Sequence, residues 1–268
     1  MNRTMNSLLF QMILVCLLSL QNIKAQNISF TDEVYSDWLQ TRIGEGDAPV
    51  FWSCFGEVYS YPDGELICYM VGADMGNRME ITPDSIVQMS RKIFIYVDPE
   101  TGEAYDTYND QKVRHIQYPY QLISYVKDGD DLRTWVTQGA GNRIQTIGPG
   151  TGISARKMGS NTIYSAPLFL DFETPRGKYE AYENYDFIYN PNADSTIDKY
   201  QMTWVRYGDK AAFAGPGKGI IQLIAHRVDS WEELPQALKN YINEKAPMWK
   251  SPPANLQEIH DIQQGKIK

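Results

Sequence analysis

The sequence predicts a mainly β fold: a single antiparallel β-barrel of the lipocalin or calycin type, or a closed β-sandwich, with one C-terminal helix. Short runs rich in Tyr, Val, Ile and Phe recur along the chain, and turn sequences separate them, including Pro62-Asp63-Gly64, Asp98-Pro99-Glu100-Thr101-Gly102 and Asp128-Gly129-Asp130. The strands do not alternate with helices, which argues against a parallel α/β fold. Strand spacing alone does not choose between barrel and sandwich.

The predicted strands lie near 51–61, 65–73, 87–97, 103–108, 112–118, 121–127, 132–138, 163–172, 179–189, 201–207 and 220–228. One helix is predicted after them, because Ser230 and Glu233 form a capping box ahead of apolar residues at helical spacing as far as Glu244. Prolines at 247, 252 and 253 end this helix. Residues 254–268 are expected to form a polar, loosely held tail.

Residues 1–25 have the pattern of a secretory signal peptide. Arg3 precedes an apolar run over residues 8–20, which is too short to span a bilayer, and Ala25 is a small residue at a plausible cleavage point. We therefore expect one β-rich domain over 26–253 in an exported protein, periplasmic or secreted, without an integral membrane segment. Its two remaining cysteines, Cys54 and Cys68, are expected to be buried free thiols, since folding at the Pro62 turn places Cys54 opposite residue 72 or 73.

Composition and motifs exclude several function classes. The net charge of −8 argues against a nucleic-acid partner, which would favour a basic surface. The three histidines do not share a short spacing and cysteines do not cluster, so we expect no metal site. No P-loop, dinucleotide-binding fingerprint or G-x-S-x-G motif is present, so no cofactor is expected. The 18 tyrosines are unusually many and favour an aromatic-lined site.

Alternation along the strands makes certain charged residues informative, because side chains of a strand point alternately to its two faces. In the run 87–97, Arg91 shares its face with Val87, Met89, Ile93, Ile95 and Val97. Lys92 shares the opposite face with Gln88, Ser90, Phe94 and Tyr96. We therefore expect Arg91 to point inward and Lys92 to be solvated.

Four further polar residues lie on apolar faces of other predicted strands: Glu57, Glu183, Arg206 and His226. An unpaired buried charge is costly, so these groups should pair with each other or with a polar ligand. One interpretation is that Glu–Arg pairs simply fill the interior of the barrel. The other is that the arginines hold a carboxylate or enolate at the base of an aromatic-lined cavity, while a Glu or His moves a proton.

Residues 91–102 read Arg-Lys-Ile-Phe-Ile-Tyr-Val-Asp-Pro-Glu-Thr-Gly. This stretch resembles the signature of an uncharacterised bacterial family called domain of unknown function 1838, in which an Arg-Glu pair leads a strand into Tyr-x-Asp-Pro-x-Thr-Gly. Trp204-Val205-Arg206 is similar to the Trp-x-Arg element of that family, and the likeness extends over most of 50–253. The chain departs from the family at Lys92, where Glu is usual, and at Tyr108-Asn109-Asp110, where Trp-x-Asn-Pro is expected. The resemblance implies an exported or stand-alone β-rich domain and supplies no established reaction.

Three functions remain open at this point. The first is a barrel that binds a small apolar or aromatic molecule carrying an acidic group, with Arg91, Arg206, Tyr96 and Trp204 as ligand-binding residues. The second is a metal- and nucleotide-independent isomerase, cyclase or lyase, with Glu57, Glu183 or His226 as its acid–base group. The third is a carbohydrate-binding surface protein whose exposed aromatic residues stack on sugar rings. The sequence does not indicate an oligomeric state.

Overall fold

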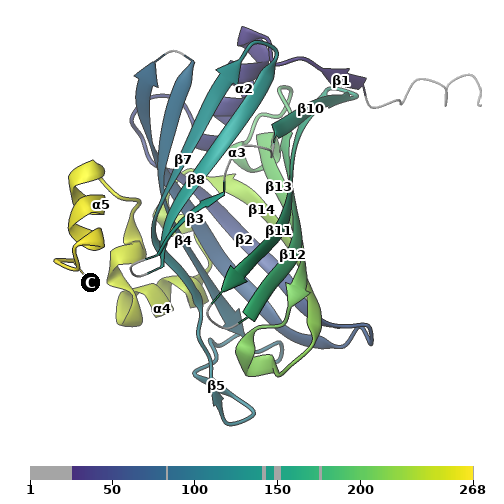
Figure 1. Ribbon diagram of the computed structural model, residues 1–268, viewed down its shortest axis with the longest axis vertical. Coiled ribbons are helices and arrows are strands. Elements are labelled where there is room, and N and C mark those ends of the chain that lie inside the picture. The colour runs from purple at the N-terminus through teal and green to yellow at the C-terminus, as the bar shows by residue number, and fades with distance from the viewer. Residues whose placement is uncertain (1–25, 83, 141–142, 148–151, 175–176, 268) are drawn as a thin grey trace, which may run out of the picture.

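The β-strands close into a barrel, which decides against the sandwich. The computed structural model describes residues 26–82, 84–140, 143–147, 152–174 and 177–267 (Figure 1). Within these ranges, ten antiparallel strands form a ring in the order β10-β11-β12-β13-β14-β2-β3-β4-β7-β8, and β8 pairs back to β10. The short strand β1 pairs with β10, and β9 pairs with β8. The predicted signal peptide lies outside the described residues.

The strands have the following bounds: β1 Gln26–Ile28, β2 Val50–Tyr61, β3 Leu66–Thr82, β4 Ser85–Val97, β5 Thr107–Tyr108, β6 Gln111–Lys112, β7 Ile116–Asp128, β8 Asp131–Ala140, β9 Arg143–Ile147, β10 Gly152–Met158, β11 Asn161–Thr174, β12 Gly177–Tyr189, β13 Tyr200–Asp209 and β14 Lys218–Val228. The helical segments are α2 Asp32–Ile43, α3 Thr196–Lys199, η2 Ala212–Ala214, η3 Trp231–Glu233, α4 Gln236–Lys245, η4 Pro247–Lys250 and α5 Leu256–Gln263.

The predicted turns connect strands as expected. The segment 62–64 joins β2 to β3, and Gly64 takes a φ of 73° that favours glycine. The Asp98 carboxylate accepts hydrogen bonds from the backbone N–H groups of Glu100 and Thr101, at 2.7 and 3.0 Å. This turn leads into the small β5–β6 hairpin before β7 pairs with β4, so the predicted strand 103–108 is reduced to two residues.

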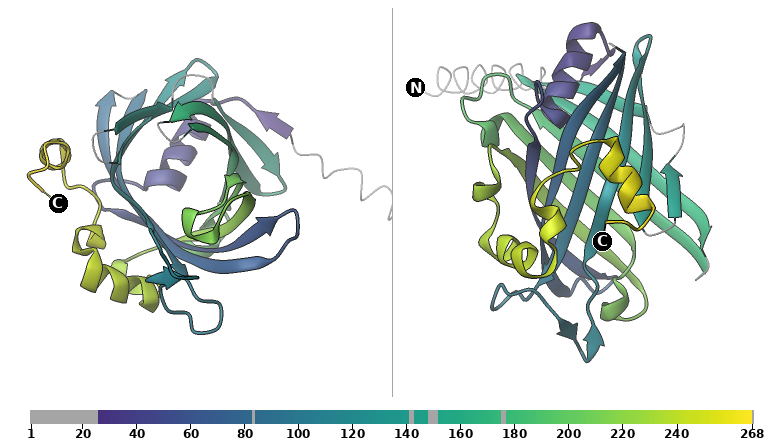
Figure 2. Two further views of the ribbon diagram at one scale, coloured as in Figure 1. Left: turned by 60° about the horizontal axis from the view of Figure 1, so that its bottom comes forward. Right: turned by 90° about the vertical axis from the view of Figure 1, so that its left-hand side faces the viewer.

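Helix α2, which the sequence patterns did not predict, lies inside the barrel (Figure 2). The Thr31 side chain caps its first turn by accepting a hydrogen bond from the backbone N–H of Val34 at 3.3 Å. Trp38 is 1% exposed and packs edge-on against Tyr125 of β7 and Phe187 of β12. The buried helix residues Tyr35, Trp38, Leu39, Arg42 and Ile43 recur at helical spacing, but the charge of Arg42 within this stripe weakens the apolar signal.

The C-terminal segments pack against the outside of the barrel, on the side of β3, β4 and β7 (Figure 2). The predicted helix is confirmed as α4, but it begins at Gln236 after Pro235 and not at Ser230, whose side chain makes no capping hydrogen bond to the short turn η3. The Ser230 hydroxyl and the backbone N–H of Asp229 instead donate to the Glu233 carboxylate, at 3.3 and 3.2 Å. Leu238 and Ile242 of α4 are fully buried against the outer face of the sheet. The expectation of a loosely held tail is wrong for Leu256–Gln263, which form helix α5.

The two cysteines lie apart in the β2–β3 register, as the sequence predicted. Cys54 on β2 pairs with Gly72 on β3, whereas Cys68 lies opposite Val58. Both thiols are buried and free. The separation along the strand therefore keeps them apart, as expected.

No helix among the described residues is long and apolar enough to cross a bilayer.

Candidate ligand site inside the barrel

The orientation predicted for β4 is wrong, because Lys92 and not Arg91 faces the barrel interior. Lys92 pairs across β3 with Asp74, on the face that carries the interior residues Ser90 and Tyr96. The cause is that α4 and η4 cover the outer face of β4, so both faces of this strand are buried. Alternation then shows that two faces exist but not which of them faces the interior.

Arg91 lies instead beneath the C-terminal segments. Its Nε donates to the carbonyl of Pro119 at 2.9 Å, and its other nitrogens donate to the carbonyls of Met248 and Ser251, at 3.0 and 2.9 Å, and to the Glu258 carboxylate. The side chain is only 2% exposed. All of these acceptors belong to the chain itself, so Arg91 holds the C-terminal segments against the outer face of the barrel.

Glu57 and His226 also lie away from the interior. Glu57 accepts a hydrogen bond from the Tyr59 hydroxyl at 2.7 Å on the outer face of β2, beside Phe55, which is 49% exposed. His226 shares the outer face of β14 with Ile224, which is 61% exposed. Both residues do lie in apolar stripes, but these stripes face outward, so the inward placement is wrong for both.

Glu183, Trp204 and Arg206 are brought together inside the barrel, as predicted. Glu183 on β12 pairs in register with Arg206 on β13, and Arg206 Nε lies 3.7 Å from Glu183 Oε1. The Trp204 indole N–H donates to Glu183 Oε2 at 3.2 Å, and the Tyr185 hydroxyl donates to the same oxygen at 3.1 Å. Burial, and then the Glu183 charge, raise the pKa of Tyr185 well above its ordinary value, so this hydroxyl keeps its proton.

The Arg206 guanidinium retains donor capacity. One terminal nitrogen donates to the Asp209 carbonyl at 3.1 Å and the other to the Tyr179 hydroxyl at 2.9 Å. A Cβ at Gly208 would lie 2.8 Å from the Arg206 side chain, so glycine leaves the space that the guanidinium fills. Burial opposes its charge, but Tyr179 and Glu183 outweigh this and raise the pKa of Arg206. A guanidinium has five N–H groups, so these contacts do not exhaust it.

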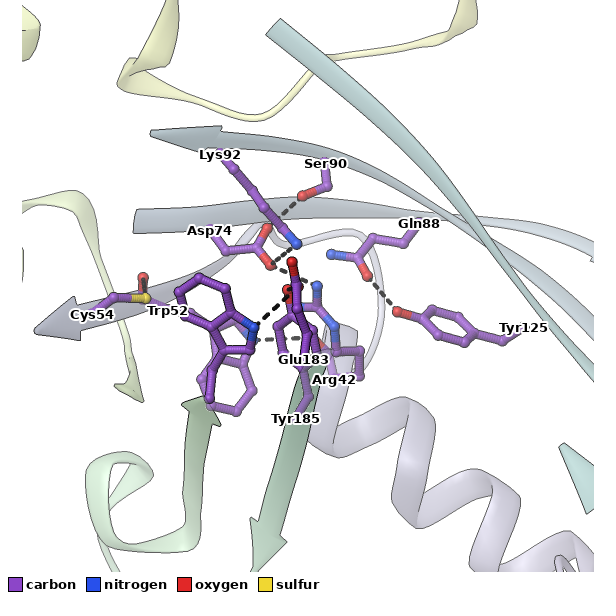
Figure 3. A network of polar contacts seen from close by, with 11 residues as sticks. Arg42, Trp52, Cys54, Asp74, Gln88, Ser90, Lys92, Tyr125, Glu183 and Tyr185 are labelled. Atoms are coloured by element: carbon purple, nitrogen blue, oxygen red, sulfur yellow. Dashed lines mark hydrogen bonds and ion pairs between the residues drawn. The ribbon is translucent and has the colours of Figure 1, made fainter. Parts of the chain in front are cut away.

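A second charged cluster lies between α2 and the strands β3 and β4 (Figure 3). Arg42 of α2 forms an ion pair with Asp74 at 2.6 Å, and the Ser90 hydroxyl donates to the other oxygen of that carboxylate. Burial alone would raise the Asp74 pKa, but Arg42, Lys92 and Ser90 lower it, so the carboxylate is ionised. Figure 3 shows Lys92 and Glu183 reaching toward the same part of the interior from opposite walls.

Lys92 is only loosely paired. Its Nζ lies 3.5 Å from Asp74 Oδ2 and 5.9 Å from the centre of the Tyr185 ring, and its side chain is 15% exposed. Asp74 is bound more closely by Arg42 and Ser90, and no hydrogen bond from Nζ to a described residue supplements the long ion pair. An ammonium group has three N–H donors, so Lys92 can bind a further acceptor.

The inward-facing surface around these charges is aromatic and accessible to water. Phe94, Tyr118 and Tyr185 point into the barrel and are only partly buried, and Glu183 and Arg206 each keep 13% exposure. Tyr96, a predicted ligand-binding residue, lies on the same inner face and is 4% exposed. Because these side chains face inward, the water that reaches them does so from within the barrel.

Sequence reasoning missed three members of the site: Arg42, Asp74 and Lys92. Arg42 belongs to the unpredicted helix α2, and Asp74 directly follows the predicted strand 65–73. Extending that strand by the alternation rule would have placed Asp74 on the face of Cys68 and Met70. For Arg42, the available signal was its place in the helical series of Tyr35, Trp38, Leu39 and Ile43, which the prediction did not use.

The comparisons with known proteins add a family likeness. The family model described as protein of unknown function DUF1838 matches residues 155–264, which confirms the resemblance noted from the sequence. The matched region contains Glu183, Trp204 and Arg206 but not Lys92 or the stretch 91–102. No curated protein and no solved structure matches the chain.

Proposed function

We propose that the barrel binds a small organic anion, an aromatic or apolar carboxylate, in its interior. The observation that carries this proposal is Lys92, an inward-facing ammonium whose nearest carboxylate lies 3.5 Å away and is already bound by Arg42. A carboxylate ligand beside Lys92 would complete the pairing that the described residues leave incomplete.

The charges of the side chains around Lys92 support an anionic ligand. Among the described residues of these two clusters, the cations Arg42, Lys92 and Arg206 outnumber the carboxylates Asp74 and Glu183 by one. The chain as a whole carries −8, so the excess is a local feature. Aromatic neighbours such as Tyr185 and Trp204 supply contact area for an organic body attached to the anionic group.

Binding is supported better than acid–base catalysis. Of the three predicted acid–base residues, Glu183 alone lies in this interior, and its carboxylate faces Tyr185, Trp204 and Arg206. These groups already contact both carboxylate oxygens and hold the carboxylate beside Arg206. Glu183 therefore fits the role of a counter-ion that positions Arg206. We include export of the protein in the proposal, to the periplasm or beyond the cell, on the strength of residues 1–25.

Isothermal titration calorimetry with small carboxylates tests the proposal. The probes are benzoate, cinnamate and indole-3-acetate, each measured against its neutral amide, and the variants are Lys92→Met and the exposed control Lys112→Gln. We expect at least one carboxylate to bind, its amide to bind less, and Lys92→Met to weaken carboxylate binding by about tenfold or more. Equal binding of carboxylate and amide, or unchanged binding by Lys92→Met, would contradict the proposal.

Native mass spectrometry of the protein purified from its own source provides an independent check. A stoichiometric mass that is released on denaturation and carries an acidic group would identify the natural ligand. A released neutral molecule would contradict the proposed ligand class.

A further inference from the structure

The outer face of the barrel carries a row of aromatic rings that crosses neighbouring strands. Phe169 on β11 pairs in register with Tyr182 on β12, and their ring centroids lie 5.1 Å apart. Tyr182 pairs with Tyr207 on β13, and Tyr207 packs edge-on against Tyr61 of β2 at 5.2 Å. The four residues Phe169, Tyr182, Tyr207 and Tyr61 are called the outer aromatic row below.

The outer aromatic row is exposed to solvent. Its members have exposed fractions of 78% for Phe169, 37% for Tyr182, 38% for Tyr207 and 49% for Tyr61. Helices α4 and α5 cover a different side of the barrel, that of β3, β4 and β7 (Figure 2). A contiguous aromatic surface in water is unfavourable, and such surfaces commonly mark binding sites.

The two lysines beside the row are paired with three carboxylates. Lys178 lies 3.2 Å from Asp171 and 2.6 Å from Glu180, and Lys218 lies 2.8 Å from Asp209. An anionic membrane surface would require cations that are free to contact it, and the lysines beside this row are paired. The excess of carboxylates therefore disfavours an anionic ligand, whereas an uncharged ligand meets no such repulsion.

Polar side chains beside the outer aromatic row suit a ligand rich in hydroxyl groups. Gln222 is exposed on the outer face of β14, directly opposite Glu57 on β2. Amides and carboxylates can exchange hydrogen bonds with hydroxyls, and aromatic rings offer flat apolar surfaces to the C–H faces of sugar rings. Burial of Glu57 against a second protein copy would instead remove a carboxylate from water, which is costly.

We propose that the outer aromatic row binds an uncharged polysaccharide chain. The row extends over neighbouring strands, each about 4.8 Å from the next, so it matches an extended oligomer better than a single sugar. This site lies on the opposite surface of the sheet from Lys92 and Glu183, and it is independent of the proposed interior ligand.

Affinity electrophoresis tests this site. The protein is run in native gels that contain a soluble β-glucan, xylan or galactomannan, with alginate as the polyanionic comparison. The test variant is Phe169→Ala/Tyr207→Ala, the conservative variant is Tyr207→Phe, and the control is Leu256→Ala, which removes an exposed apolar residue from α5. Size-exclusion chromatography with light scattering measures the oligomeric state of each protein.

We expect at least one neutral polysaccharide to retard the wild-type protein, and the double variant to lose roughly tenfold or more in affinity. Tyr207→Phe, Leu256→Ala and the interior variant Lys92→Met should retain binding. Retardation in alginate alone, or in no gel, would overturn the proposal. A wild-type dimer that the double variant converts to a monomer would assign the face to a second copy of the chain, and this result would also overturn it.

Discussion

Replacement of Arg91 should destabilise the protein without removing the interior site. Arg91→Met removes the donors to Pro119, Met248, Ser251 and Glu258, and the side chain is 2% exposed, so water cannot readily replace them. Loss of a buried hydrogen-bonded charge of this kind costs about 3–5 kcal/mol in the free energy of unfolding. That is a large part of the roughly 5–15 kcal/mol that stabilises an ordinary domain.

The matched variant for this test is Glu258→Gln. Its amide oxygen can still accept from Arg91, and the Glu258 side chain is 25% exposed, so we expect a loss of about 1 kcal/mol. Urea unfolding at pH 7 measures both variants, and limited proteolysis shows whether the segment around Ser251 is released. The folded Arg91→Met protein should still bind the carboxylate probes. A loss of stability below about 1 kcal/mol for Arg91→Met, or a selective loss of ligand binding, would refute this account of Arg91.

Acidification should weaken the same contact. Burial opposes the charge on Glu258, but the backbone N–H of Ala254 and the Arg91 guanidinium lower its pKa below the ordinary 4.5. A carboxyl group whose pKa is lowered on folding stabilises the protein above its unfolded-state pKa. This contribution is lost as the pH falls below 4.5 through the folded-state pKa, so proteolysis near Ser251 should accelerate there in the wild type. An Arg91→Met protein should show little further change.

Three other predictions follow from buried groups. The pKa of His115 is lowered to about 4 by burial, and its Nδ1 accepts the backbone N–H of Tyr96 at 3.1 Å, so the unfolded chain binds more protons between pH 4 and 6.5. Stability should therefore fall by about 1–2 kcal/mol as the pH drops through that window, after allowance for partial exposure, and urea unfolding of His115→Asn should show a flatter profile. Gly72→Ala places a Cβ 2.2 Å from the Phe94 ring, so thermal unfolding should show a loss of about 2 kcal/mol or more, and a neutral result would mean that the ring moves aside at little cost. Burial raises the pKa of both cysteine thiols, to about 12 for Cys68. A thiol reagent at pH 8 should therefore modify them only after unfolding. Rapid labelling of the native protein would contradict their buried placement.

The site was predictable where one face of a strand is buried and the other is exposed. On β12, the inward residues Glu183 and Tyr185 alternate with Tyr182, which is 37% exposed, so the pattern identified the interior correctly. On β13, Trp204 and Arg206 followed the same rule. The rule failed for Glu57 and His226, because the outer faces of β2 and β14 also carry apolar residues, including Ile224 at 61% exposure.

By itself, the sequence determined the features that depend on neighbouring residues: the turns, the antiparallel strands between them, the C-terminal helix α4, and the register that separates Cys54 from Cys68. Only the tertiary structure decided which face of β4 is the interior, because packing of α4 and η4 buries the outer face as well. Arg42 of α2 and Asp74 of β3, which are 32 positions apart, meet only when the barrel closes around the helix. Local patterns record which residues avoid water, whereas the partner of each buried group depends on contacts between distant parts of the chain.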